Sequence, residues 1–163
     1  MNAAHFHLLV NHLPIIFPIV GILVMISALI SKSEPVKRTA YLIFIVGSLT
    51  AIVAMTSGEG AEEVVEKING VTKNSIESHE EAAEIFAILA YILGGLSIVG
   101  LWANYKQRTF SNTISTITLI FAIVVMLFAK QTGTTGGEIR HTEIVNTNNI
   151  TTQPNSDFNK ESD

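Results

Sequence analysis

Histidine and acidic residues occur in four short clusters, each beside a long apolar stretch. The first cluster, AHFHLLVNHLP, contains His5, His7 and His12. His5 and His12 are seven positions apart, so a continuous helix would place them on nearly the same face and point His7 elsewhere. Imidazole is a ligand for haem iron, non-haem iron, zinc and copper. Pro14 frees the carbonyl of Val10, so a helix that opens there gains a polar pocket.

The second cluster is acidic and follows the second apolar stretch, in the segment TSGEGAEEVVEK. Glu59 lies between two glycines, where the backbone can bend and aim the carboxylate inward. Glu63 follows one helical turn later. We take Glu59 and Glu63 as candidate metal ligands, and we assign Glu62 and Glu66 to a solvated acidic loop.

The third cluster, SHEEAAEIF, precedes the third apolar stretch and contains His79, Glu80 and Glu84. Glu80 and Glu84 are four positions apart and share a helix face. Glu84 directly precedes Ile85 in the apolar run. A carboxylate at that depth needs a partner, which could be a metal, a histidine, a proton or Arg140. The Arg140 alternative would make the pair structural.

The fourth cluster follows the last apolar stretch, in the segment QTGTTGGEIRHTEI. Gly136 and Gly137 would let the chain fold back over the helices. Glu138 and His141 then form a Glu-x-x-His pair. In di-iron bundles this spacing supplies two ligands from one helix, so we take both residues as candidate metal ligands.

Four apolar stretches position these clusters, at residues 8–30, 39–57, 82–103 and 114–129. A helix of about 20 apolar residues crosses a hydrocarbon core of ~30 Å. In a chain that crosses the membrane four times, the first and third crossings start on one side of the membrane. The second and fourth crossings end on that same side. All four clusters lie at those positions, so we expect them to converge.

Composition supports this membrane assignment. The chain has 163 residues, of which 48% are hydrophobic and only 15% charged, and its mean hydropathy is +0.42. Soluble domains carry about 25% charged residues. A soluble bundle of buried helices is the alternative, but soluble helices normally show a polar face, and the first and last stretches show almost none. The predicted fold is therefore an all-α, integral membrane four-helix bundle.

The charges of the loops predict its orientation. The first loop carries Lys32, Lys37 and Arg38 against Glu34, the third carries Lys106 and Arg108, and the second is rich in Glu. Short basic loops stay in the cytoplasm. We therefore expect a multi-pass protein of the bacterial inner membrane with both termini on the outer, periplasmic side. Lys130 and Arg140 are exceptions, because these basic residues follow the fourth stretch and would lie on the outer side.

The sequence predicts one transmembrane domain with a polar tail, and it excludes several kinds of site and partner. Residues 1–145 form the predicted transmembrane domain with its outer-face polar cluster, and residues 146–163 form a polar tail that we expect to be disordered. The absence of Cys excludes disulfides, thiolate metal sites, covalent c-type haem and iron–sulfur clusters. A net charge of −4 without a basic cluster argues against a nucleic-acid partner.

The chain resembles a bacterial family of predicted four-helix membrane proteins of unknown function, over roughly residues 5–130. The matching positions are His7, His12, Pro14, Ser57, Gly58 and His79. One position departs from the pattern, because Leu8 stands where the family has Pro after its first His. Members of the family are sometimes joined to cytochrome c modules, so the resemblance implies a redox or haem-linked setting.

We expect a metal- or haem-binding module at the outer face, linked to redox chemistry. The expected core ligands are His12 and His79, with His5, His7 and His141 as alternates. Haem b would use two of His7, His12, His79 and His141. An iron, zinc, copper or manganese ion would be bound by carboxylate ligands in addition to histidines. The candidate metal ligands are His5, His7, His12, Glu59, Glu63, His79, Glu80, Glu84, Glu138 and His141.

Two further hypotheses remain open at this point. The chain could be a structural or assembly subunit of a membrane respiratory complex, with the histidines making interfacial hydrogen bonds only. It could also conduct protons or ions, although the middle of each span holds no ionisable His, Asp, Glu, Lys or Arg. The expected partners are the lipid bilayer and an electron-transfer or respiratory-complex protein.

Overall fold

Apolar sequence without polar interruption forms helices here, because only intrahelical hydrogen bonds satisfy the backbone in lipid. The computed structural model describes residues 2–67 and 71–140, and within these it contains helices and no strands. The helices are α1 (Ala3–Val10), α2 (Leu13–Ser31), α3 (Glu34–Val65), α4 (Lys73–Tyr105) and α5 (Ser111–Arg140). The all-α prediction is confirmed.

The first crossing is broken into two helices. Asn2 caps α1 by accepting a hydrogen bond from the backbone N–H of His5 at 2.9 Å. Helix α1 ends at Val10, and α2 begins at Leu13 with Pro14 in its first turn. The first crossing therefore opens ahead of Pro14, at Asn11 and His12.

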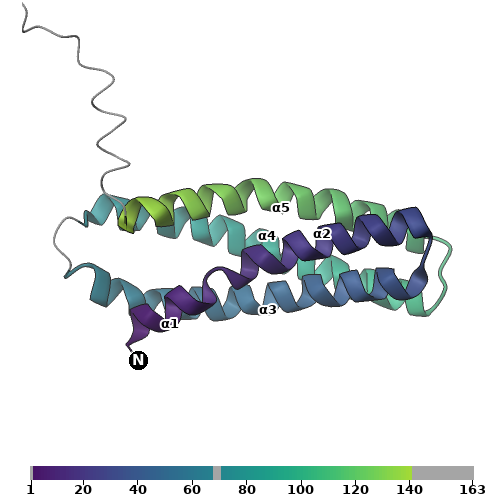
Figure 1. The fold of residues 1–163 in the computed structure, drawn as a ribbon, viewed down its shortest axis with the longest axis horizontal. Helices are drawn as coiled ribbons and strands as arrows, with labels where there is room; N and C mark the ends of the chain where they lie inside the picture. Colours follow the sequence, from purple (N-terminus) through teal and green to yellow (C-terminus); the bar gives the residue numbers. More distant parts are fainter. Residues whose placement is uncertain (1, 68–70, 141–163) are drawn as a thin grey trace, which may run out of the picture.

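The helices run alternately up and down (Figure 1). Helix α3 packs against α2 and α4, α5 packs against α4, and a smaller contact between α2 and α5 closes the ring. Helix α1 lies against α3. Helix α1, the end of α3, the start of α4 and the last turn of α5 gather at one end, which we call the histidine end. The two short connections 32–33 and 106–110 form the other, which we call the arginine end.

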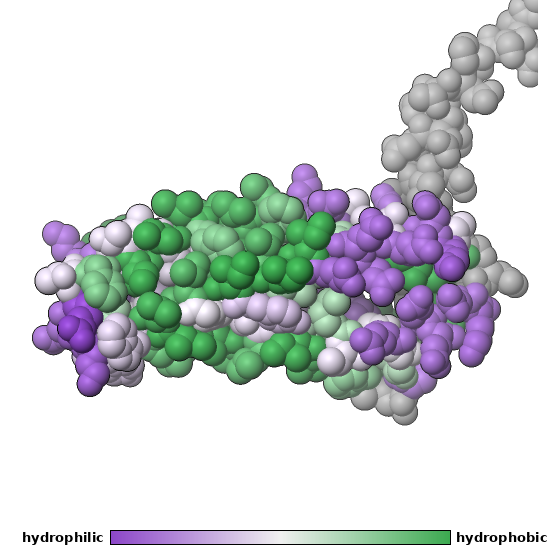
Figure 2. All heavy atoms as spheres, turned by 180° about the vertical axis from the view of Figure 1, so that it is seen from behind, coloured by the Kyte–Doolittle hydropathy of each residue, from purple (hydrophilic) through white to green (hydrophobic). Residues whose placement is uncertain are grey.

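The helices are longer than a bilayer is thick. Four segments are long and apolar enough to cross a membrane, with α1 and α2 counted as one. Helix α4 has 33 residues, which corresponds to a length of roughly 50 Å. Exposed apolar side chains form a band around the middle, and polar side chains cover both ends (Figure 2). On α4 this band begins at Ile85, so His79 lies roughly 9 Å beyond its edge.

Glycines on the inner faces let the helices approach closely. A Cβ atom would collide with the ring of Phe44 at Gly21, with Ser48 at Gly94 and with the ring of Tyr41 at Gly100. The Tyr41 hydroxyl donates to Ser115 Oγ at 3.0 Å, which fixes that ring in the core. These contacts support helix packing as the role of the glycines, as small residues do generally in membrane bundles.

Two adjacent glycines give a direct test of this packing. A Cβ atom at Gly94 would collide with Ser48, whereas one at Gly95 would meet no atom within 4 Å. We expect Gly94→Ala to lower the thermal unfolding temperature of the detergent-purified protein. Gly95→Ala should be neutral or slightly stabilising, because alanine is the better helix former by up to ~1 kcal/mol. Equal losses in both variants would contradict the packing.

Candidate histidine site

Two of the predicted ligands turn into the bundle at the histidine end. His7 on α1 and His79 in the N-terminal part of α4 are both half-buried. Their sequence separation is large, but the alternating helices bring them to the same end. Both residues therefore lie at the histidine end, as the sequence predicts for the starts of the first and third crossings.

The His7 ring is anchored by a hydroxyl group on α3. Its Nδ1 lies 2.9 Å from Ser57 Oγ. The Ser57 hydroxyl donates its single hydrogen to the backbone carbonyl of Ala54, also at 2.9 Å. We assign the hydroxyl hydrogen to this carbonyl, and with that assignment Ser57 Oγ accepts from His7 and the proton of the neutral ring lies on Nδ1.

The His79 ring is anchored in the same way by α5. Its Nδ1 lies 3.1 Å from Thr135 Oγ1. The Thr135 hydroxyl donates to the backbone carbonyls of Gln131 at 3.2 Å and Thr132 at 3.1 Å. We assign the one hydroxyl hydrogen to these carbonyls, and with that assignment Thr135 Oγ1 accepts from His79 and the ring proton lies on Nδ1.

The two anchors have one chemical consequence. A neutral imidazole with its proton on Nδ1 carries an unprotonated lone pair on Nε2. Hydrogen bonding through the other nitrogen is how proteins orient metal-ligating histidines. His7 and His79 thus each offer an oriented nitrogen that can bind a metal or accept a proton.

Glycines in the facing helices make room for the rings. A Cβ atom at Gly136 would lie 2.9 Å from His79 Cε1, which is closer than such atoms normally approach. A Cβ at Gly58 would lie 3.6 Å from His7 Cε1, an ordinary contact distance. The fold-back expected at Gly136 and Gly137 does not occur, because α5 continues as a helix to Arg140. Gly136 instead provides space for His79.

Helix α5 is also tied directly to the start of the apolar part of α4. The Thr132 hydroxyl donates to the backbone carbonyl of Ala82 at 2.9 Å. Thr132 and Thr135 lie three positions apart, so one face of α5 holds both the interhelical bond and the His79 anchor. We did not predict either threonine. The signal was the run of small polar residues, TGTTGG, directly after an apolar span.

The other predicted ligands lie outside this pair. His12 is at the junction of α1 and α2, and its side chain is exposed. The side chains of His5, Glu59, Glu63, Glu80 and Glu84 are exposed, and Glu138 is half-buried on α5. His141 lies outside the described residues. Within the described residues no three or more His, Asp and Glu side chains are grouped as a metal site requires.

The glycine pair on α5 tests the position of His79. Gly136→Ala should push the His79 ring from its place and weaken its bond to Thr135, because the new methyl group would lie against Cε1. Gly137→Ala is the matched control, since a Cβ there meets no atom within 4 Å. Ring resonances of His79 in NMR spectra of the detergent-solubilised protein should shift in the first variant and not in the second. Unchanged His79 resonances in Gly136→Ala would contradict the geometry.

Comparison with known proteins agrees with the architecture. The profile of a family described as "Predicted membrane protein (DUF2231)" matches residues 4–149. No curated protein and no solved structure gives a significant match to the chain. The family match covers most of the chain, and the four long apolar helices agree with its description. The chain is therefore a multi-pass membrane protein that belongs to the DUF2231 family of predicted membrane proteins.

Proposed function

We propose that this protein is a membrane-embedded module that binds a transition-metal centre at the histidine end, through Nε2 of His7 and of His79. The observation that supports it is the pair of anchors at Nδ1. Ser57 and Thr135 hold the two rings by hydroxyl groups whose hydrogens we assign to nearby backbone carbonyls. This leaves a free, oriented nitrogen on each ring.

The two imidazole ligands limit which kinds of metal centre the site could bind. Two imidazoles without any Cys suit haem b with two axial histidines. They also suit an iron, zinc, copper or manganese ion whose other positions are taken by water, an external ligand or a carboxylate. His141, which follows α5 in the sequence, is a further candidate ligand. A redox role is what the sequence resemblance implies, since members of that family are sometimes joined to cytochrome c modules.

The orientation of the site follows from the loop charges. Lys37, Arg38 and Arg108 lie at the arginine end. Basic loops favour the cytoplasmic side, so we assign the histidine end to the periplasmic side of a bacterial inner membrane. There the centre would meet electron-transfer partners in the periplasm. A proton conduit is less well supported, because the apolar middle of the helices contains no His, Asp, Glu, Lys or Arg.

Metal content tests the proposal. We expect protein purified in a mild detergent to carry a stoichiometric metal by elemental analysis, or to show a Soret band if the centre is haem. His7→Ala and His79→Ala should each abolish the metal or the band, because each removes one ligand. Thr135→Val should weaken metal affinity roughly 10- to 100-fold, as expected when the group that orients a ligand is lost.

Two exposed histidines provide the controls. His5→Ala and His12→Ala change the same residue type in or beside α1, outside the buried pair, and should keep the metal. The proposal is wrong if the wild-type protein binds neither haem nor any of iron, zinc, copper and manganese after titration. It is also wrong if His5→Ala and His12→Ala lower binding as strongly as His7→Ala and His79→Ala.

A further inference from the structure

A pocket of about 310 Å³ opens at the arginine end, beside the start of α5. It is formed by residues of α3, α4, the connection 106–110 and α5, among them Arg38, Arg108 and Ser111. Its volume is within the range of small-ligand pockets, ~300–1,000 Å³. The pocket is at the opposite end from His7 and His79 and is independent of the metal proposal.

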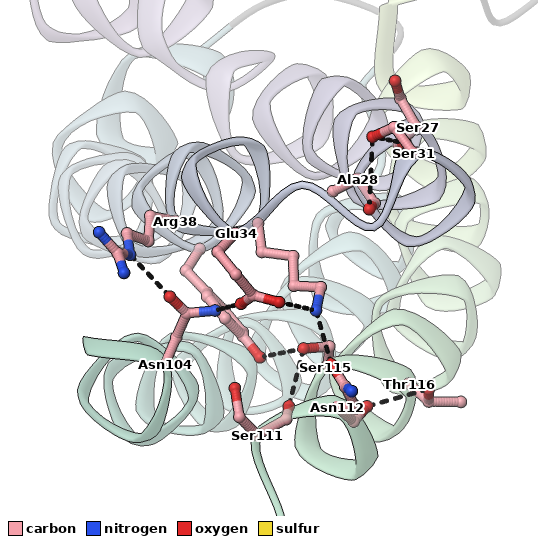
Figure 3. A network of polar contacts seen from close by, with 12 residues as sticks. Ser27, Ala28, Ser31, Glu34, Arg38, Asn104, Ser111, Asn112, Ser115 and Thr116 are labelled. Atoms are coloured by element: carbon pink, nitrogen blue, oxygen red, sulfur yellow. Dashed lines mark hydrogen bonds and ion pairs between the residues drawn. The ribbon is translucent and has the colours of Figure 1, made fainter. Parts of the chain in front are cut away.

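The one carboxylate in this pocket is already neutralised. Glu34 accepts a hydrogen bond from Lys37 Nζ at 2.7 Å, and Asn104 Nδ2 donates to its other oxygen (Figure 3). Lys37 is only 3% exposed and also donates to Asn112 Oδ1 at 2.6 Å. A buried cation requires such partners. Glu34 therefore compensates Lys37 and leaves the arginines of the pocket without an opposite charge.

Two arginines are held in place by contacts that do not cancel their charge. Arg38 donates from Nε to Asn104 Oδ1 at 2.6 Å and stacks on the ring of Tyr105 at 4.2 Å. Its guanidinium points away from Glu34 in Figure 3. Arg108 lies 5.3 Å from the centre of the Trp102 ring. Within the described residues neither arginine forms an ion pair, and guanidinium groups bind phosphate through paired N–H donors.

A buried hydroxyl group in the pocket has no partner. Ser111 is 8% exposed, lines the pocket, and its Oγ makes no hydrogen bond within the described structure. A buried hydroxyl without a partner costs free energy. Ser111 is also the first residue of the 30-residue helix α5, and the N-terminus of a helix attracts anions. The hydroxyl, the helix N-terminus and the arginines all favour an anionic ligand.

We propose that this pocket binds the phosphate group of an anionic phospholipid, with Arg38, Arg108 and Ser111 as its main contacts. The membrane level of the pocket favours a lipid over a soluble phosphate. Trp102, Tyr105 and Phe110 are 48%, 60% and 43% exposed around it. Exposed aromatic residues of this kind are typical of the bilayer interface. A lipid bound there keeps its phosphate in the pocket and its acyl chains against the apolar band.

Thermal unfolding of the full-length protein in mild detergent tests the proposal. Phosphatidylglycerol should raise the unfolding temperature more than phosphatidylcholine or inorganic phosphate at equal concentration. Arg108→Gln should weaken the apparent affinity for phosphatidylglycerol about tenfold, because a charge-assisted contact is lost. Lys106→Gln is the matched control. It removes the same charge from the same connection at an exposed residue outside the pocket, and should change the affinity less than about twofold.

A second variant separates binding from folding. Ser111→Ala removes the hydroxyl that has no partner, so the lipid-free protein should unfold at the same temperature as wild type or higher. The same variant should gain less stability from phosphatidylglycerol than wild type does. Equal stabilisation by phosphatidylglycerol and phosphatidylcholine would overturn the proposal. So would an equal effect of inorganic phosphate, which would assign the pocket to a soluble anion, or equal losses in Arg108→Gln and Lys106→Gln.

Discussion

The hydrocarbon interior of a bilayer offers the backbone no hydrogen-bonding partner, and the architecture of this protein depends on that constraint. The chain can cross only as helices, and α2 to α5 do so in alternating directions. Charged side chains gather at the two ends of the apolar band, while the middle of the helices holds only uncharged polar groups such as Ser97 and Thr118. Each end therefore joins residues from distant parts of the sequence: His7 and His79 at one end, Glu34, Asn104 and Asn112 at the other.

Most of the fold could be predicted from the sequence, because hydropathy and helix length report directly on membrane crossing. The break in the first crossing lies directly ahead of Pro14, which sits in the first turn of α2, where a missing backbone N–H is tolerated; Pro18, in contrast, lies inside α2 without breaking it. The path of the chain after Gly136 could not be predicted from residue types. Glycine permits a bend, but α5 packs on α4, where Thr132 donates to the Ala82 carbonyl, and it continues as a helix to Arg140.

The candidate site was only partly predictable, because the orientation of a side chain depends on where helices break. The spacing of His5 and His12 indicated a shared face only for a continuous helix. The break at Asn11 and His12 changes that relation, and it is His7 that points inward while His12 is exposed. The anchoring groups Ser57 and Thr135 come from other helices. Which hydroxyl meets which ring depends on how the helices pack. The spacing of residues within one segment does not predict that packing.

The central claim is that Ser57 and Thr135 fix the protons of two imidazoles and leave the opposite nitrogens free. Nitrogen NMR of histidine-labelled protein, at a mildly alkaline pH where imidazole is neutral, measures this directly. Our account predicts that His7 and His79 are each protonated at Nδ1 and bare at Nε2, unlike the exposed His5. Protonation at Nε2 in both rings, or the averaged signals of freely exchanging histidines, would contradict it.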